Sequence, residues 1–205
     1  MSPGPTLHLQ LRDRCYGCFR PVYDCFCAAI PTIDNTTEVL ILQHRQERFH
    51  PFNTARIVRQ ALRNSALLID RPRQLANRLK LKPGAVLLYP GPDAQLLTSD
   101  FAERPEQLVI LDGTWHHAKT LMRDIPALQS LPRYQLAPSA PSRYRIRLEP
   151  SNEYLSTVEA TVAALRVLEP QTSGLEQLLQ AFDRMVEQQL FRAGRCYVPK
   201  GQFSG

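Results

Sequence analysis

The chain has 205 residues, 43% of them hydrophobic, which is enough to bury the core of one α/β domain with small attachments. Its 25 lysines and arginines outnumber 19 acidic residues, for a formal net charge of +6 that is mostly arginine, so a nucleic-acid partner is favoured, with a solvated basic surface as the alternative. No apolar run approaches the roughly 20 residues of a membrane-spanning helix, and Met1–Arg14 lacks the apolar middle of a signal peptide, so we expect no membrane partner and a cytoplasmic protein, or a nuclear one in a eukaryote.

Four of the five cysteines follow this lead-in, with the spacing C-x2-C-x6-C-x-C. In a reducing compartment such a cluster is more often a metal site than a pair of disulfides, and zinc is the usual ion for four thiolates. Four protein ligands leave no open coordination position, so we expect a structural zinc. The predicted ligands are Cys15, Cys18, Cys25 and Cys27. Residues 1–30 are predicted to form the tail and this zinc knuckle, and Cys196 is interpreted as an incidental thiol.

A strand and a helix are predicted next. Glu38–Gln43 is a continuous apolar run, typical of a central parallel strand, and it places His44 and Glu47 at its carboxyl end. Asn53 can cap the helix that follows. One face of that helix is basic and is either exposed to solvent or in contact with RNA phosphates. The residues of this face are Arg56, Arg59 and Arg63.

Two further short strands are predicted at Ala66–Ile69 and Ala85–Tyr89, with the basic helical stretch Arg71–Lys82 between them. The second strand ends in a rigid loop that begins Tyr89-Pro90-Gly91. Its backbone groups could meet a ligand, although most such sequences only turn the chain.

The segment Leu108–Arg123 predicts a buried strand, a tight turn and a helix. The strand ends at Asp112-Gly113, and from Thr114 the apolar residues recur at helical intervals. We expect Trp115 to pack in the core, because a sole tryptophan on an apolar helix face is more often core than a ligand contact, and stacking on a base is the alternative. Open α/β sheets bind ligands at the carboxyl ends of their strands, so this turn is a candidate site. The helix residues expected toward solvent are His116, His117, Lys119 and Arg123.

The rest of the chain predicts two strands and two helices. Arg133–Leu136 and Tyr144–Leu148 alternate as strands do. The first helix begins with a capping box from Ser156 to Glu159, which gives Glu159 a sufficient structural role. The second helix carries an apolar stripe over Leu175–Leu190 that is most simply a core contact. The alternation of strands and helices predicts an α/β domain with a mostly parallel sheet over residues 31–205.

Taken in order, these motifs resemble the DTW-domain family of tRNA-uridine aminocarboxypropyltransferases. The family signature, Asp-x-Thr-Trp followed by a helix, stands at Asp112–Trp115. One departure is Arg45, where such proteins often have proline, and it affects the expected shape of the loop with His44 and Glu47. The resemblance also covers the cysteine knuckle, Gln43-His44 with Glu47, Asn53-Thr54, Tyr89-Pro90, Tyr144–Arg147 and Ser156–Ala160.

The resemblance implies a SPOUT-like, knotted fold that holds S-adenosylmethionine in loops near the C-terminal knot. It also implies transfer of the 3-amino-3-carboxypropyl group of that donor to N3 of a uridine in tRNA, with release of methylthioadenosine. The predicted donor-binding residues are Leu88, Tyr89, Pro90, Gly91, Leu111, Gly113, Thr114, Trp115, Thr157 and Glu159. The predicted RNA contacts are His44, Arg56, Arg59, Arg143 and Arg145.

Asp112 is the predicted catalytic residue. A strand-end carboxylate in a crevice can accept the proton that uridine N3 must lose. It could instead hold a ribose hydroxyl or the cationic donor, or cap the turn. Thr114 can either cap the helix or bond the donor. Two rival functions fit the same features: a SPOUT-like RNA methyltransferase, and a zinc-containing RNA-binding module without chemistry. No feature indicates an obligatory protein partner.

Overall fold

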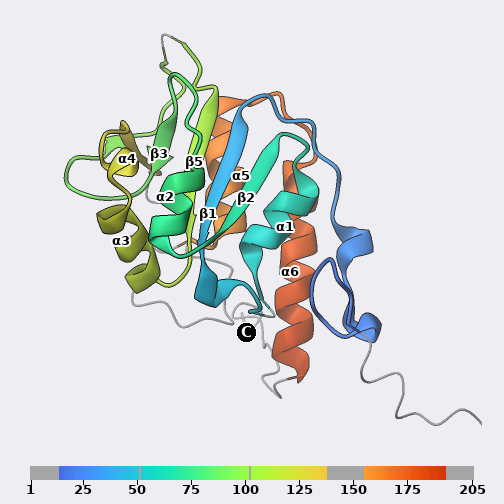
Figure 1. The fold of residues 1–205 in the computed structure, drawn as a ribbon. Helices are drawn as coiled ribbons and strands as arrows, with labels where there is room; N and C mark the ends of the chain where they lie inside the picture. Colours follow the sequence, from blue (N-terminus) through green and yellow to red (C-terminus); the bar gives the residue numbers. More distant parts are fainter. Residues whose placement is uncertain (1–13, 51, 102, 138–154, 193–205) are drawn as a thin grey trace, which may run out of the picture.

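The computed structural model describes residues 14–50, 52–101, 103–137 and 155–192 (Figure 1). Within these residues one sheet of six strands has the order β2-β1-β5-β3-β6-β4, and every pair of neighbours is parallel. The prediction of an α/β fold with a mostly parallel sheet is confirmed. The strands are β1 Glu38–His44, β2 Ser65–Asp70, β3 Val86–Leu88, β4 Gln95–Leu96, β5 Gln107–Asp112 and β6 Arg133–Gln135.

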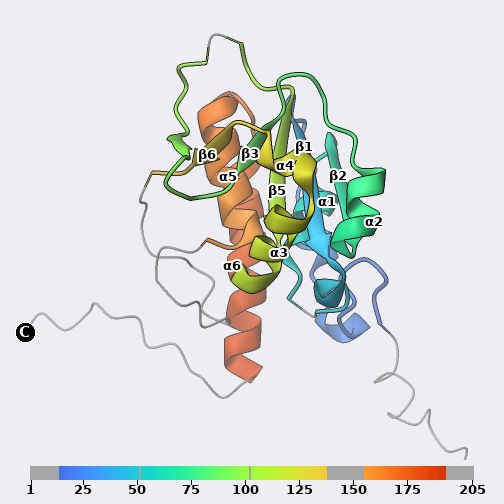
Figure 2. The ribbon, with the colours of Figure 1, turned by 60° about the vertical axis from the view of Figure 1, so that its left-hand side comes forward.

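Helices cover both faces of the sheet. One face carries α1, α5 and α6, and the other carries α2, α3 and α4 (Figures 1 and 2). The α-helices are α1 Thr54–Ala61, α2 Pro72–Arg78, α3 Trp115–Asp124, α4 Pro126–Gln129, α5 Thr157–Leu168 and α6 Leu175–Arg192. Short 3-10 helices span Val22–Asp24, Cys27–Ala29 and Arg45–Glu47.

Several predicted boundaries shift. The basic helix predicted to reach Lys82 ends at Arg78, because Leu79 has an extended backbone. Strand β4 and helix α4 were not predicted. The predicted strand Tyr144–Leu148 lies outside the described residues. So do residues 138–154, which form most of the chain that joins β6 to α5, and the knotted SPOUT-like arrangement stays a prediction.

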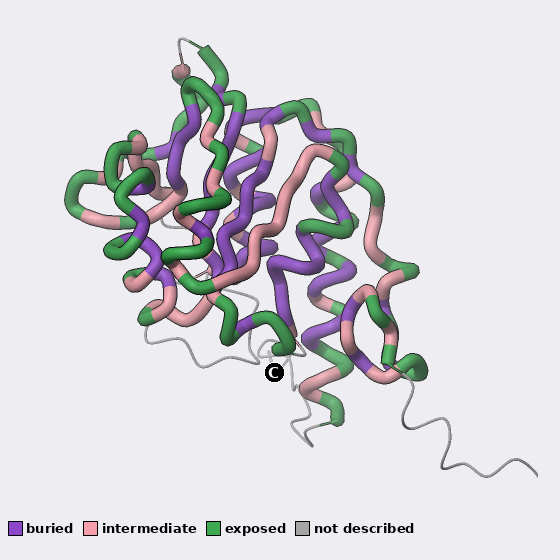
Figure 3. Tube along the Cα trace, in the orientation of Figure 1, coloured by how far each residue is buried: buried purple, intermediate pink, exposed green. Residues whose placement is uncertain are grey.

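The apolar residues of β1 and β5 contribute to two separate cores, one on each face of the sheet. Side chains alternate along a strand, so Val39 and Ile41 pack with α1, α5 and α6, whereas Leu40 and Leu42 pack against α2 and α3. Figure 3 shows the central strands buried along their length. Burial on both faces explains why these strands read as continuous rather than alternating apolar sequence.

The two central strands send the chain to opposite faces. Strand β1 is followed by α1, which packs in the larger core, and β5 is followed by α3, which packs in the other. The strands pair in parallel, with Gln43 opposite Asp112 at their carboxyl ends. A reversal of this kind leaves a crevice where open α/β sheets bind ligands. The fold therefore places the Asp112 turn at such a point.

The N-terminal knuckle docks on the ends of α1 and α6. Arg56 and Gln60 of α1 donate to the carbonyl oxygens of Cys18 and Gly17, at 3.3 and 3.1 Å. Arg192 of α6 pairs with Asp24 at 2.7 Å. Residues 14–30 thus belong to the same packed body as the sheet, although the division into units 1–30 and 31–205 stays a prediction. In the described part of the chain, no helix combines the length and apolar character that crossing a membrane requires.

Candidate functional site

A hydrogen-bond network joins four elements at the β1–β5 crevice. Gln43 Nε2, at the end of β1, donates to Asp112 Oδ2 at 2.7 Å and to Asn53 Oδ1 at 3.0 Å. Asn53 Oδ1 also accepts from Arg56 N and so caps α1, as predicted. Thr157, the first residue of α5, donates its hydroxyl to Asp112 Oδ1. Asp112 is 8% exposed, and both of its carboxylate oxygens are held by side chains from neighbouring elements.

Gln43 leaves one acceptor unused. Its Nε2 faces Asn53 Oδ1 and Asp112 Oδ2, which are both acceptors. Gln43 Oε1 is buried and has no hydrogen-bond partner among the described residues. A buried acceptor without a partner costs about 1–3 kcal/mol. The Asp112 carboxylate therefore lies beside a buried amide oxygen that still has the capacity to accept a hydrogen bond.

A second polar cluster lies on the other side of the turn. His117 Nδ1 donates to Glu47 Oε1 at 2.9 Å, and the same oxygen accepts from Thr114 N at 3.3 Å. The His117 and His44 rings stack with centroids 4.1 Å apart. His117 was predicted to face solvent, and this is wrong: its side chain is 16% exposed because Glu47 draws it in. Burial, and next the nearby His117, lower the pKa of His44 below its ordinary value.

Steric constraints fix the turn between these clusters. Gly113 has φ of +150°, and a Cβ there would lie 2.8 Å from His117 Cβ. Only glycine fits without a shift of the helix. Thr114 accepts from His117 N at 3.2 Å and is the N-cap of α3, so the capping role is the one that the structure shows.

Trp115 was predicted to pack in the core, and this is wrong. It is the first residue of α3, lies beyond the edge of the sheet and is only partly buried. Its ring lies parallel to that of Tyr89, with centroids 5.6 Å apart and planes 6° apart. The Tyr89 loop and the Asp112 turn were predicted to share a pocket, and this stack shows that they meet.

The other predicted donor-binding residues divide into two groups. Leu88 pairs with Ile110 of β5, Leu111 pairs with Leu42 of β1, and Thr157 contacts Asp112. Glu159 forms the predicted capping box, in which Ser156 N donates to Glu159 Oε2 at 2.8 Å and Glu159 N donates to Ser156 Oγ at 3.3 Å. No contact in the described structure joins the remaining two to this network. They are Pro90, which is exposed, and Gly91, where a Cβ would meet no atom within 4 Å.

The predicted RNA contacts also divide. His44 lies at the site and Arg59 is exposed on α1. Arg56 is 9% exposed and its guanidinium donates to the carbonyl oxygens of Cys18 and Arg48, so it is buried under the knuckle, and its role as an RNA contact stays a prediction. The knuckle covers this part of α1, which helical periodicity cannot reveal. Arg143 and Arg145 lie outside the described residues.

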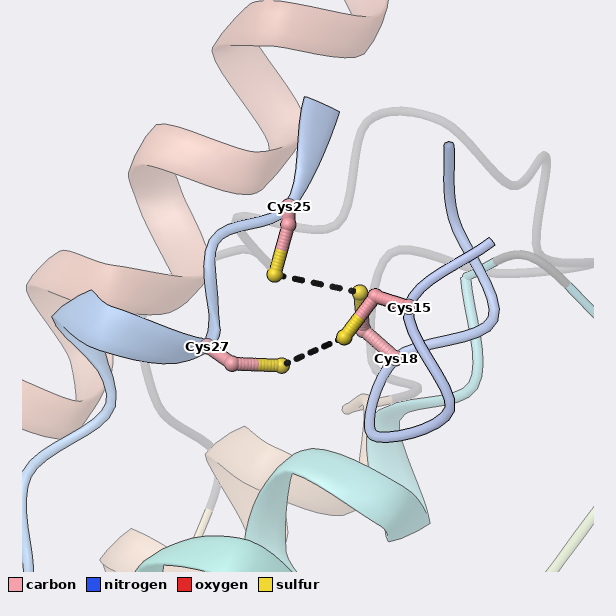
Figure 4. Close-up of side chains that lie close together, drawn as sticks. All are labelled: Cys15, Cys18, Cys25 and Cys27. Atoms are coloured by element: carbon pink, nitrogen blue, oxygen red, sulfur yellow. Dashed lines mark hydrogen bonds between the residues drawn. The ribbon is translucent and has the colours of Figure 1, made fainter. Parts of the chain in front are cut away.

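The four predicted zinc ligands converge. Their sulfur atoms lie within 4.8 Å of one another and point toward a common centre (Figure 4). A hydrogen bond from the Cys18 backbone lowers the pKa of Cys15 to about 6, while burial raises the pKa of the Cys18 and Cys27 thiols. A bound cation would reverse the latter effect by stabilising the thiolates. The cluster can therefore hold a metal ion.

Three site features were missed at the sequence level: the link from Asn53 through Gln43 to Asp112, the pairing of Glu47 with His117, and the Tyr89–Trp115 stack. The available signal was Gln43 itself, a buried polar residue that directly follows the apolar run 39–42 of β1. A buried amide in such a place needs partners. Its partners come from other elements, so the sequence alone could not name them.

Comparison with known proteins places the chain in a family. The model of the DTW domain matches residues 12–190. A Drosophila melanogaster protein named tRNA-uridine aminocarboxypropyltransferase 2 is 30% identical over 87% of this chain and 76% of its own. A Mus musculus protein of the same name is 28% identical over 96% and 70%, and Arabidopsis thaliana tRNA-uridine aminocarboxypropyltransferase A is 27% identical over 82% and 77%. No solved structure gives a significant match. With its signature at Asp112–Trp115 and a match that also spans the cysteine cluster, the chain belongs to the DTW domain family.

Proposed function

We propose that this protein is a tRNA-uridine aminocarboxypropyltransferase. It would transfer the 3-amino-3-carboxypropyl group of S-adenosylmethionine to N3 of a uridine in tRNA and release methylthioadenosine. The names of its relatives support this activity. The structural observation that carries the proposal is the Asp112 carboxylate, which two side-chain donors hold at the β1–β5 crevice. Beside it lies Gln43 Oε1, which has no partner within the described part of the chain.

The chemistry of the donor fits these residues. S-adenosylmethionine has a cationic sulfonium, an ammonium that donates hydrogen bonds, and a flat adenine. Gln43 Oε1 has no partner among the described residues and can accept from the ammonium, and the neighbouring Tyr89–Trp115 stack offers an aromatic surface for the adenine. We propose that the donor is held by the loop after Leu88, by the 111–115 turn and by the first turn of α5 with Thr157 and Glu159.

Transfer is mainly a problem of orientation. Uridine N3 must lie in line with the methionine-side carbon rather than the methyl carbon, since the sulfonium activates both. The N–C bond then forms as the C–S bond breaks, the sulfur leaves as a neutral thioether, and the N3 proton passes to a base. We propose Asp112 as this base. The alternative is His117, whose Nε2 can accept a proton while Glu47 holds Nδ1.

The products identify the reaction. Purified protein incubated with unmodified tRNA and donor should yield methylthioadenosine and a modified uridine. S-adenosylhomocysteine would instead support the rival methyltransferase. Binding of tRNA without either product would support the non-catalytic module.

Two substitutions test the base. Asp112→Asn should lower kcat about 100-fold or more while the donor Kd stays within a few-fold, because a general base contributes about 10²–10⁴ in rate. Glu103→Gln, an exposed acid outside the crevice, is the control. If instead Asp112→Asn leaves kcat unchanged and His117→Gln lowers kcat about 100-fold or more, the base is His117.

For the cysteine cluster we propose zinc. Four sulfurs at 2.3 Å from one tetrahedral ion lie about 3.8 Å apart. The Cys15–Cys27 and Cys18–Cys25 sulfur pairs are 3.7 and 3.9 Å apart. Four thiolates fill the coordination shell, so the ion would stabilise the knuckle and take no part in transfer. A SPOUT-like knot and a cytoplasmic location complete the proposal, and both rest on the resemblance and composition alone.

A further inference from the structure

An open cavity of about 620 Å³ adjoins the crevice at the carboxyl ends of β1 and β2. This volume lies in the range of ligand pockets, about 300–1,000 Å³. His44 forms part of its wall, and the His44 ring stacks on His117 beside the Asp112 turn. The cavity and the candidate site therefore share a wall. Its lining residues are His44, Arg45, Gln46, Arg48, Phe49, Arg71 and Pro72.

Three exposed arginines line this cavity. Arg45 and Arg48 follow β1 and Arg71 follows β2, and none pairs with an acidic side chain among the residues that the structure describes. Asp70 precedes Arg71, but its carboxylate accepts from the Arg71 backbone N–H and faces Arg78 at 3.4 Å. Three guanidiniums without a counter-charge make a site for an anion, and arginine binds phosphate in a bidentate way.

An exposed aromatic ring borders these arginines. Phe49 is 65% exposed, and the Arg48 guanidinium lies over its ring at 5.1 Å. The Phe49 ring also forms a T-shaped pair with Phe19 of the knuckle, with centroids 5.7 Å apart. Phe19 is itself held by the Arg56 guanidinium at 4.0 Å from its centroid. An exposed aromatic ring beside guanidiniums is the combination with which proteins bind unpaired nucleotides.

We propose that this cavity, which we call the arginine cavity, binds an unpaired nucleotide of the RNA that adjoins the target uridine. Its phosphates would contact Arg45, Arg48 and Arg71, and its base would stack on Phe49. The inference rests on the proposed function, because tRNA is the acceptor there. The alternative anion is the carboxylate of the donor. One carboxylate needs only one or two guanidiniums and no aromatic surface, so RNA fits the cavity better.

Binding of a labelled, unmodified tRNA transcript in the absence of donor tests the arginines. Arg45→Gln, Arg48→Gln and Arg71→Gln should each weaken tRNA binding about 3- to 10-fold and reduce the slope of log Kd against log salt by about one. The donor Kd, measured by calorimetry, should change less than about twofold. Arg104→Gln, an exposed arginine outside the cavity, is the matched control. Unchanged tRNA binding in all three variants would overturn the proposal, as would a loss confined to donor binding.

Phe49 gives an independent readout. Phe49→Ala should weaken tRNA binding at least about fivefold without altering the salt slope, because stacking on one base contributes about 1–3 kcal/mol. Phe49→Tyr keeps the ring and should restore affinity. If the wild type, Phe49→Ala and Phe49→Tyr bound tRNA equally well, stacking on Phe49 would be contradicted. Failure of the proposed function is distinct: no modified uridine would form in the transfer assay, whatever these binding measurements show.

Discussion

The Asp112 carboxylate receives one hydrogen bond from β1 and one from α5, through Gln43 and Thr157. A group that acts on a reacting atom loses rate when it is displaced by even a fraction of an ångström. The two donors therefore do more than satisfy a buried charge. They fix the direction in which the carboxylate faces the crevice.

Thr157→Val tests this orientation, because it removes the hydroxyl with little change in shape. We expect kcat to fall about tenfold and the free energy of unfolding to fall by about 1–3 kcal/mol, since a buried carboxylate loses a donor. Transfer assays and urea unfolding measure the two effects. Thr161→Val is the matched control, since that buried hydroxyl donates only to the Thr157 carbonyl. Equal loss of kcat in both variants would contradict the orienting role.

Gly113→Ala tests the turn itself. The backbone conformation and the 2.8 Å approach of a Cβ to His117 Cβ both oppose any side chain. We expect a loss of about 1–3 kcal/mol in the free energy of unfolding, the usual cost of such strain. The start of α3 must also shift, so kcat should fall. Gly91→Ala is the control for stability, because a Cβ there meets no atom within 4 Å. A Gly113→Ala protein with normal stability would show that the turn is adaptable.

At the scale of elements, periodicity predicted most strands and helices but not what covers them. The apolar runs of β1 and β5 indicated buried strands, and the Ser156–Glu159 capping box fixed the start of α5. Arg56 was placed on an outer face of α1, yet the knuckle packs there. The order of strands and the partners of Gln43 depend on contacts between residues far apart in the chain, which no local pattern encodes.

One such long-range contact joins the end of α5 to the segment before β1. The Glu169 carboxylate accepts from Thr36 N at 2.9 Å and also from Thr37 N and the Thr172 hydroxyl. Burial alone would raise the pKa of Glu169, but these hydrogen bonds outweigh it and the pKa lies below its ordinary value. The carboxylate thus stabilises the fold in its ionised form, above the ordinary glutamate pKa, and this contribution is lost as pH falls through the lowered value.

Glu169→Gln should therefore destabilise the protein most at neutral pH. We expect a difference of about 1.5–3 kcal/mol in the free energy of unfolding at pH 7, because hydrogen bonds to a charged group are lost. The difference should shrink as pH falls below the ordinary glutamate pKa and through the lowered pKa of Glu169, where the wild-type carboxylate becomes protonated. Urea unfolding at several pH values measures it. Glu176→Gln, on an exposed pair with Arg166, should show little difference at any pH. If the difference in the free energy of unfolding between wild type and Glu169→Gln stayed constant with pH, the role of the ionised form would be contradicted.

At the scale of the whole molecule, the crevice, the arginine cavity and the cysteine knuckle lie along one line of contacts. His44 joins the crevice to the cavity, Phe49 joins the cavity to Phe19, and Phe19 belongs to the knuckle. Arg56 stabilises these contacts, because its guanidinium donates hydrogen bonds to the carbonyl oxygens of Cys18 and Arg48. The metal site would then support the RNA surface without touching the donor crevice.

Removal of the metal should affect the RNA surface and leave the donor crevice unchanged. The purified protein should contain about one zinc per chain, and a strong chelator should lower its melting temperature, because the binding free energy of a structural zinc is also folding free energy. With the knuckle loosened, Phe19 no longer supports Phe49. We therefore expect tRNA binding to weaken several-fold while the donor Kd changes little, as measured by anisotropy and calorimetry.

Cysteine variants separate metal loss from side effects of the chelator. Cys25→Ser removes one ligand and should reproduce both the loss of zinc and the weaker tRNA binding. Cys196→Ser alters the one cysteine outside the cluster and should leave both unchanged. Metal-free protein with an unaltered melting temperature would exclude a structural zinc. If it melted early but bound tRNA normally, the knuckle would stabilise the fold without shaping the arginine cavity, and Phe49 would owe its position to β1 and Arg48 alone.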